Sequence, residues 1–190
     1  YRCVDDREAV VQTYADNPND LSDGTLGENV TVELIQERPN LELVFPPGGF
    51  DPNDTATIGP DAIAYDSSEE EYVIIEAKTS NSTDAVGIGL LSDAYNNSTQ
   101  LSDEWILASI TELQQRGQID SELANDVLNA TAAGNISKEI VFARDNPDAV
   151  GRTLTNPRRN ATDISRDSVV GVDRVTIIEL QAPTTNQSAN

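Results

Sequence analysis

The stretch that decides the fold is Ile58-Gly-Pro-Asp-Ala-Ile-Ala-Tyr-Asp66, which is followed by Tyr72-Val-Ile-Ile-Glu-Ala-Lys78. The Gly-Pro pair interrupts regular secondary structure, and the apolar residues after Asp61 predict a short strand. The polar residues between the two stretches predict a hairpin turn, and the β-branched start of the second predicts a buried strand. Alternation along that strand places Glu76 and Lys78 on one face. We therefore expect Asp61, Glu76 and Lys78 to meet where the two strands end.

Two carboxylates beside a lysine are the side chains that metal-assisted hydrolysis of a phosphodiester requires. Mg²⁺ usually binds one or two carboxylates together with waters and substrate phosphate oxygens, and Asp61 and Glu76 are the candidate ligands. Bound Mg²⁺ or Mn²⁺ would polarise the scissile phosphate and lower the pKa of a bound water. Lys78 would orient that water or stabilise the charge that develops on phosphorus. The alternative is that these residues have no catalytic role. Asp61 would then only end a turn, and Glu76 and Lys78 would form an ion pair on the surface of an edge strand.

These motifs, G-P-D-A-I-A-Y-D at 59–66 and Y-V-I-I-E-A-K-T-S at 72–80, resemble those of the PD-(D/E)xK nuclease superfamily over roughly residues 26–145. The resemblance implies an α/β fold with a restriction-endonuclease-like three-layer core, in which a mixed central sheet is flanked by helices. It also implies a catalytic glutamate on the helix that precedes the motif. Glu28 is the candidate for that position, and Glu33 is the fallback.

The segment Gln100-Leu-Ser-Asp-Glu-Trp-Ile106 is similar to a Q-x-S-D-x-W-[IV] signature of nuclease domains at the ends of polymorphic toxins. This similarity implies a DNA or RNA substrate, a secreted toxin or effector that acts in the cytoplasm of a target cell, and an immunity protein as partner. Gln100 is the candidate substrate-binding residue, with helix capping as its alternative role. We expect Trp105 to anchor the core rather than to stack on bases.

The charge of the chain is extreme, with 33 acidic and 12 basic residues and a net charge of −21. Only two of the basic residues are lysines, a composition that resembles proteins of extreme halophiles. Molar salt would screen the self-repulsion of such a chain. The alternative is an acidic protein that binds cations or basic partners. A usual nuclease is less acidic, and the negative charge of this chain would repel nucleic acid. We therefore expect the positive charges of Arg158 and Arg159 to provide the contacts with substrate phosphates. The alternative is that these arginines pair with neighbouring aspartates.

Several classes of site are excluded by composition. The chain has no histidine and one cysteine, so serine–histidine catalysis, histidine zinc sites and an internal disulfide are ruled out. No apolar run reaches the roughly 18 residues of a transmembrane helix. The chain contains no methionine and starts at Tyr1, so we expect a processed product or a domain of a larger secreted protein. A cytoplasmic repair or restriction enzyme of a halophile is the alternative.

The chain is rich in N-x-[ST] triplets, which are acceptors for N-glycosylation in secreted proteins. The candidate asparagines are Asn29, Asn53, Asn81, Asn96, Asn97, Asn129, Asn135, Asn160 and Asn186. A composition rich in Ser, Thr and Asn can also produce such triplets without any glycan. Occupied triplets would favour a second function, a secreted glycosylated structural or adhesion protein that retains a nuclease-like fold without activity.

We expect four segments along the chain. They are an N-terminal helix and linker over 1–25, a nuclease-like core over 26–145, an Arg-containing loop with the final strand over 146–180, and a flexible tail over 181–190. Helices are predicted at 4–16, 28–37, 83–95, 102–115 and 120–133, and strands at 41–45, 61–66, 72–78, 138–143 and 172–180.

Overall fold

The computed structural model describes residues 9–13, 24–46, 58–80, 91, 98–145 and 172–181. The strands are β1 (Ala9–Thr13), β2 (Leu41–Phe45), β3 (Ala62–Asp66), β4 (Glu71–Ser80), β5 (Ile136–Asp145) and β6 (Arg174–Gln181). The helices are α1 (Gly24–Glu37), α2 (Asp103–Gln115) and α3 (Ser121–Ala133). This mixture confirms the predicted α/β class.

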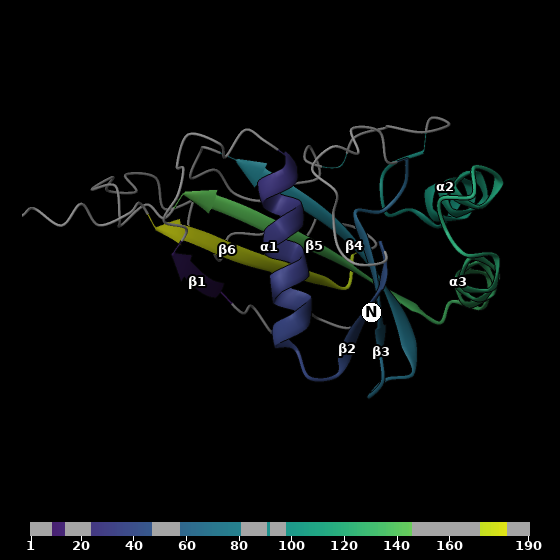
Figure 1. The fold of residues 1–190 in the computed structure, drawn as a ribbon, viewed down its shortest axis with the longest axis horizontal. Coiled ribbons are helices and arrows are strands. Elements are labelled where there is room, and N and C mark those ends of the chain that lie inside the picture. Colours follow the sequence, from purple (N-terminus) through teal and green to yellow (C-terminus); the bar gives the residue numbers. More distant parts are fainter. Residues whose placement is uncertain are drawn as a thin grey trace, which may run out of the picture.

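The strands form one mixed sheet in the order β1-β6-β5-β4-β3-β2 (Figure 1). Strands β2, β3 and β4 are antiparallel neighbours, whereas β4, β5, β6 and β1 run parallel to one another. The polar turn between β3 and β4 is held by Asp66, whose Oδ1 accepts hydrogen bonds from the backbone N–H and hydroxyl of Ser68 at 2.8 and 2.6 Å. The predicted mixed sheet and its hairpin are therefore confirmed.

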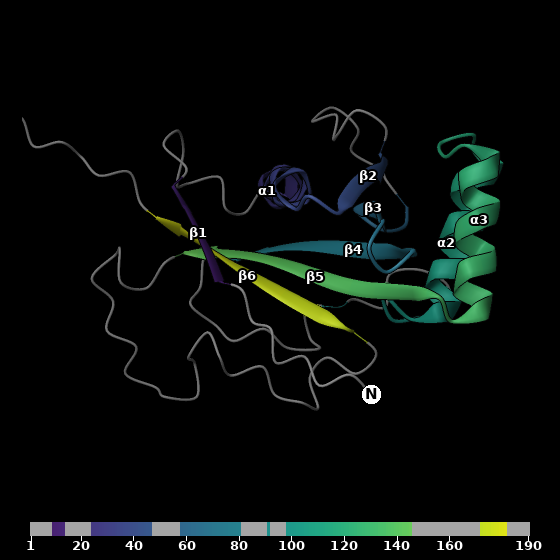
Figure 2. The ribbon, with the colours of Figure 1, turned by 90° about the horizontal axis from the view of Figure 1, so that it is seen from below.

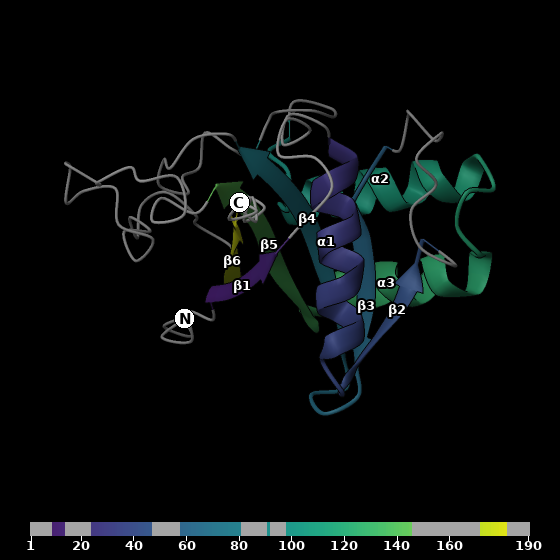
Figure 3. The same ribbon diagram turned by 60° about the vertical axis from the view of Figure 1, so that its left-hand side comes forward.

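Helices cover both faces of the sheet. Helix α1 packs on the face that presents Ala62, Val73 and Ile75, and the side chains of this face form one buried apolar cluster. The opposite face presents Ile63 and Ile74 to a second cluster that includes α2 and α3. Figure 2 shows α1 end-on above the sheet, and Figure 3 shows α1 in front of the sheet with α2 and α3 behind it.

The ends of α2 and α3 follow from capping residues in the sequence. Ser102 accepts a hydrogen bond from the backbone N–H of Trp105 and begins α2, while Asp120 accepts from the first turn of α3. Gly134 ends α3 in the left-handed conformation that favours glycine. These two helices lie where the sequence predicted them. No helix among the described residues is long and apolar enough to cross a membrane.

The predicted N-terminal helix is wrong where the structure can be compared with it. Ala9–Thr13 forms strand β1, which pairs in parallel with β6. The β-branched residues Val10, Val11 and Thr13 favour a strand. The rest of that predicted helix, the helix predicted at 83–95 apart from Leu91, and the tail from 182 lie outside the described residues.

Candidate active site

The three residues of the central motif meet at a fork between two strands. Strand β3 pairs with β4 as far as Ala62, which lies opposite Ile75, whereas β4 continues to Ser80 alongside β5. At the fork the backbone N–H of Ala77 donates a 2.7 Å hydrogen bond to Oδ2 of Asp61. The Asp61 carboxylate thus continues the hydrogen bonding at the point where the β3–β4 ladder ends.

The Gly-Pro pair holds Asp61 at this fork. Gly59 has φ +113°, a backbone conformation that favours glycine. A Cβ atom at Gly59 would lie 3.1 Å from Cδ1 of Leu113 and 3.3 Å from Cβ of Ser109, so the chain passes close against α2. Pro60 is buried beside it. The G-P-D order is therefore a packing requirement that fixes where Asp61 begins its strand.

Glu76 is the buried centre of the site, with 2 % of its surface exposed. Its Oε1 atom accepts two hydrogen bonds, from Nζ of Lys78 and from Nε2 of Gln100, each at 2.6 Å. Its Oε2 atom is buried and has no hydrogen-bond donor among the described residues. The two oxygens of this carboxylate therefore have different surroundings.

Asp61 and Glu76 influence each other's ionisation. Burial raises the pKa of Asp61 to about 8, the negative charge of Glu76 adds to this, and the Ala77 N–H and the Lys78 ammonium oppose it. Burial also raises the pKa of Glu76, while Lys78 and Gln100 oppose that rise. The closeness of the two carboxyl groups raises the pKa of Asp61 further and lowers that of Glu76, which favours a proton on Asp61.

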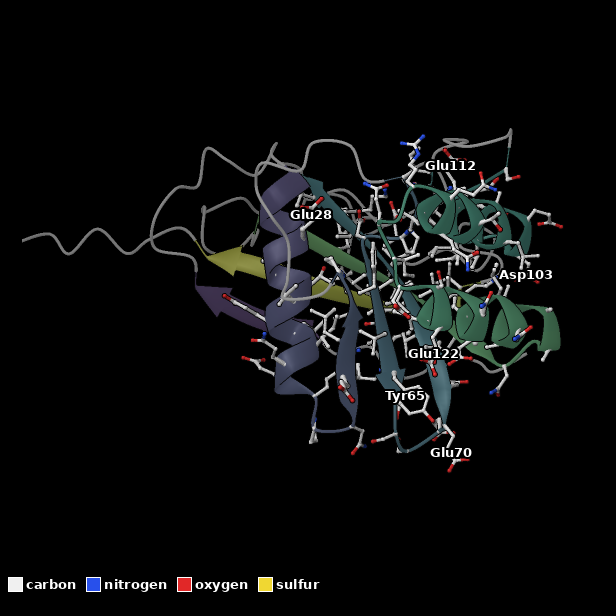
Figure 4. All side chains as sticks on the ribbon, turned by 45° about the vertical axis from the view of Figure 1, so that its right-hand side comes forward. Glu28, Tyr65, Glu70, Asp103, Glu112 and Glu122 are labelled. Carbon is white, nitrogen blue, oxygen red and sulfur yellow. The ribbon has the colours of Figure 1, made fainter. Side chains whose placement is uncertain are left out.

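Glu28 lies near the start of α1, the end of the helix that approaches the motif. Helix α1 lies over the other face of the sheet, although its first turn reaches β4 near the motif, since a Cβ at Gly27 would lie 3.7 Å from Cβ of Ala77. Figure 4 shows Glu28 at that end of α1. The fallback residue Glu33 is exposed, further along α1. A catalytic role for Glu28 stays a prediction.

Each named residue of the Q-x-S-D-x-W segment makes a contact that stabilises the fold or the site. Gln100 binds Glu76, Ser102 caps α2, and Asp103 forms a 2.5 Å ion pair with Lys138 of β5. Trp105 is 1 % exposed inside the core, which confirms its predicted role as an anchor. Contact of Gln100 with a substrate stays a prediction, as do the roles of Arg158 and Arg159, which lie outside the described residues.

The donor set of the fork fits a hard divalent cation. Asp61 and Glu76 bring carboxylate oxygens together in a buried place, and Oε2 of Glu76 lacks a fixed hydrogen-bond donor. Mg²⁺ commonly binds through one or two carboxylates and completes its shell with waters and substrate oxygens. Within the described residues, no third Asp, Glu or Cys joins the pair in a three-ligand cluster. Among the described residues, the fork therefore offers two side-chain carboxylates as ligands.

Comparison with protein-family models, with curated proteins and with solved structures finds no match to the chain. No similar protein indicates what the residues of the fork do, so their function has to be inferred from their own chemistry.

Sequence reasoning missed a second buried polar cluster, on the α1 side of the sheet. Glu139 of β5 is 1 % exposed and receives both Nη atoms of Arg38 at 2.7 and 2.8 Å. The hydroxyl of Thr176 donates to the same carboxylate at 2.6 Å. The available signal was a glutamate that directly precedes the apolar run 140–143. Because the donors of this cluster bind Glu139 closely, the cluster holds α1 to the sheet.

Proposed function

We propose that the chain is a metal-dependent nuclease that hydrolyses phosphodiester bonds in DNA or RNA. The observation that carries this proposal is the pair formed by the buried Glu76 and the partly buried Asp61 at the β3–β4 fork, with Lys78 hydrogen-bonded to Glu76. A carboxylate pair removed from water is costly unless something compensates its charge. In this proposal a divalent cation held by the pair provides that compensation.

Asp61 and Glu76 would hold Mg²⁺ or Mn²⁺ through oxygen atoms, with water and substrate completing its shell. When bound, the cation would supply Lewis-acid polarisation of the phosphate and a lowered pKa for a coordinated water. Asp61 would give up its proton as the cation binds, because ligating carboxylates must be deprotonated. Lys78, whose side chain is 21 % exposed, would turn from Glu76 to orient the attacking water or to face the scissile phosphate.

The order of elements supports the restriction-endonuclease-like arrangement as part of this proposal. Helix α1 comes first, the antiparallel strands β2, β3 and β4 follow, and β5 joins β4 in parallel after α2 and α3. The motif residues lie on β4 and immediately before β3, as the resemblance implies. Glu28 at the start of α1 would support a ligand or a second metal in this arrangement.

The biological setting belongs to the same proposal. We infer a secreted toxin or effector domain that acts in the cytoplasm of a target cell and is held in check by an immunity protein. Arg158 and Arg159 would contact substrate phosphates, and molar salt would screen the repulsion between an acidic nuclease and its polyanionic substrate. A cytoplasmic repair or restriction enzyme of a halophile is the alternative setting.

A second candidate function is a secreted glycosylated structural or adhesion protein that keeps this fold without activity. It is favoured by Asn129 and Asn135, which are exposed around the end of α3 and would leave room for glycans. In the triplet of Asn129, however, the hydroxyl of Thr131 is buried and bonds the backbone oxygen of Val127. Glycan transfer to Asn129 would therefore have to precede the folding of α3.

Cleavage of plasmid DNA and of total RNA in molar KCl tests the nuclease proposal. We expect cutting with Mg²⁺ or Mn²⁺, none with EDTA, and loss of cutting in both Glu76→Gln and Lys78→Met. The matched control is Lys138→Met, since Lys138 is the other lysine of the chain and likewise pairs with a carboxylate, that of Asp103. A folded native protein that cuts neither substrate with either metal would contradict the proposal and favour the non-enzymatic alternative.

A further inference from the structure

The two oxygens of Glu76 are treated differently by the residues around them. Oε1 accepts hydrogen bonds from Lys78 and from Gln100, each at 2.6 Å, while Oε2 is buried without a fixed donor among the described residues. Asp61 shows a related arrangement, because its Oδ2 is held by the backbone N–H of Ala77. Each carboxylate of the pair thus has one oxygen that is engaged by the surrounding protein.

Gln100 comes from a corner of the chain that is held on its C-terminal side. The next residue, Leu101, is 2 % exposed and has a backbone φ of +65°. Residues other than glycine rarely adopt this conformation, and they keep it where the surrounding structure imposes it. Ser102 then donates its backbone N–H to the Thr99 oxygen at 3.0 Å and caps α2. The buried Trp105 anchors the first turn of that helix in the core. The Gln100 amide is therefore delivered to Glu76 from a rigid support.

We propose that Gln100 is a positioning residue that keeps Oε1 of Glu76 occupied, so that Glu76 presents Oε2 alone, as a monodentate ligand, to the divalent cation. This inference rests on the proposed nuclease function. Lys78 shares Oε1 but has to leave it to reach the attacking water or the phosphate. The neutral amide of Gln100 donates a hydrogen bond to Oε1 without adding a positive charge that would repel the cation.

Binding of Mn²⁺ to the full chain in molar KCl, followed by calorimetry, tests this role without any substrate. We expect Gln100→Leu to weaken Mn²⁺ binding by about 10- to 100-fold, the usual consequence of removing a residue that orients a metal ligand. Gln100→Asn keeps the amide but shortens its reach, so it should weaken binding in the same direction and serves if the leucine variant does not fold. The matched control is Gln114→Leu, because the Gln114 amide also donates to neighbouring side-chain and backbone oxygens but lies in the C-terminal turns of α2. We expect it to bind Mn²⁺ as the native chain does.

Infrared difference spectra of the same proteins with and without Mg²⁺ separate positioning from a merely structural role. A monodentate carboxylate has more widely separated antisymmetric and symmetric stretching bands than a bidentate one. We expect the wide separation in the native chain, a narrower separation in Gln100→Leu, and in Glu76→Gln the disappearance of the bands that belong to Glu76. If both Gln100 variants bind the metal with the affinity of the native chain and show the same carboxylate bands, the positioning role is overturned and the nuclease proposal is left intact. A native chain that binds no Mn²⁺ would overturn both.

Discussion

Asp61 is a carboxyl group whose surroundings in the folded chain favour its protonated form. Burial and the charge of Glu76 raise its pKa from 3.8 to about 8. Between about pH 4 and pH 8 the folded chain therefore keeps a proton that the unfolded chain releases. The contribution of Asp61 to stability is fully present below this range and is lost as the pH rises through it. The free energy of unfolding should fall by at most about 1.4 kcal/mol for each pH unit.

Urea unfolding of the native chain and of Asp61→Asn across that pH range, in molar KCl, measures this contribution. Asparagine resembles the protonated aspartate, since it can still accept from the Ala77 N–H and donate to Glu76, but it does not titrate. The native free energy of unfolding minus that of the variant should decrease steadily as the pH rises. A difference that stays constant with pH would mean that Asp61 is ionised in the folded chain.

The meeting of Asp61, Glu76 and Lys78 could be predicted because alternation along a strand assigns side chains to faces. The hydrogen bond from Ala77 to Asp61 could not, since it depends on the residue at which β3 separates from β4. Register is set by the packing of the whole sheet, whereas the motif records only spacing along one chain segment. The same limit applies to Gln100, whose contact with Glu76 depends on the corner at Leu101.

At the scale of elements, the end of α1 is attached to two strands by one buried ion pair. Arg38 follows α1 and binds Glu139 of β5 with both Nη atoms, and one of them also donates to Thr176 of β6 at 3.0 Å. Glu139 is 1 % exposed, so water cannot replace its partner. Without Arg38, the Glu139 carboxylate keeps only the Thr176 hydroxyl and the exposed Arg174, whose Nη1 lies 4.0 Å from Oε2, so most of its buried charge loses its compensation.

We therefore expect Arg38→Met to lower the free energy of unfolding by about 3–5 kcal/mol, as measured by urea unfolding followed by circular dichroism. The control is Arg116→Met, which breaks the exposed ion pair with Glu112 within α2 and should cost about 0.3–0.5 kcal/mol. The double change Arg38→Met with Glu139→Met should recover part of the loss, because the unpaired charge is then gone. Equal losses in the Arg38 and Arg116 single variants would contradict a stabilising role for the buried pair.

Elements with local signals could be predicted from the sequence. Helices α2 and α3 carry their own caps, and β3 and β4 carry alternation and a turn. Strand β1 was predicted as helix, because its pairing with β6 joins residues near opposite ends of the chain and leaves no local pattern. The cluster around Glu139 escaped for the same reason, since Arg38 and Thr176 are distant from it in sequence.

At the scale of the whole molecule, the net charge of −21 makes the chain repel itself. The screening length is about 10 Å in 0.1 M salt and about 3 Å in 1 M salt, so repulsion between exposed carboxylates acts across the surface only in dilute salt. If the acidic composition is an adaptation to high salt, the free energy of unfolding should rise as KCl is increased towards molar concentrations.

A charge-reduced variant separates screening from a general effect of salt on the core. Glu37, Glu42 and Glu70 are exposed on α1, on β2 and in the β3–β4 turn, and changing all three to glutamine reduces the net charge from −21 to −18. Because fewer charges then need screening, the variant should reach a given stability at a lower KCl concentration than the native chain, as followed by thermal unfolding. Any effect of KCl on burial of the core acts equally in both proteins, because they share that core, and would shift the two curves together. Identical salt dependence in native chain and variant would therefore assign the acidic surface to something other than salt-dependent folding, such as binding of cations or basic partners.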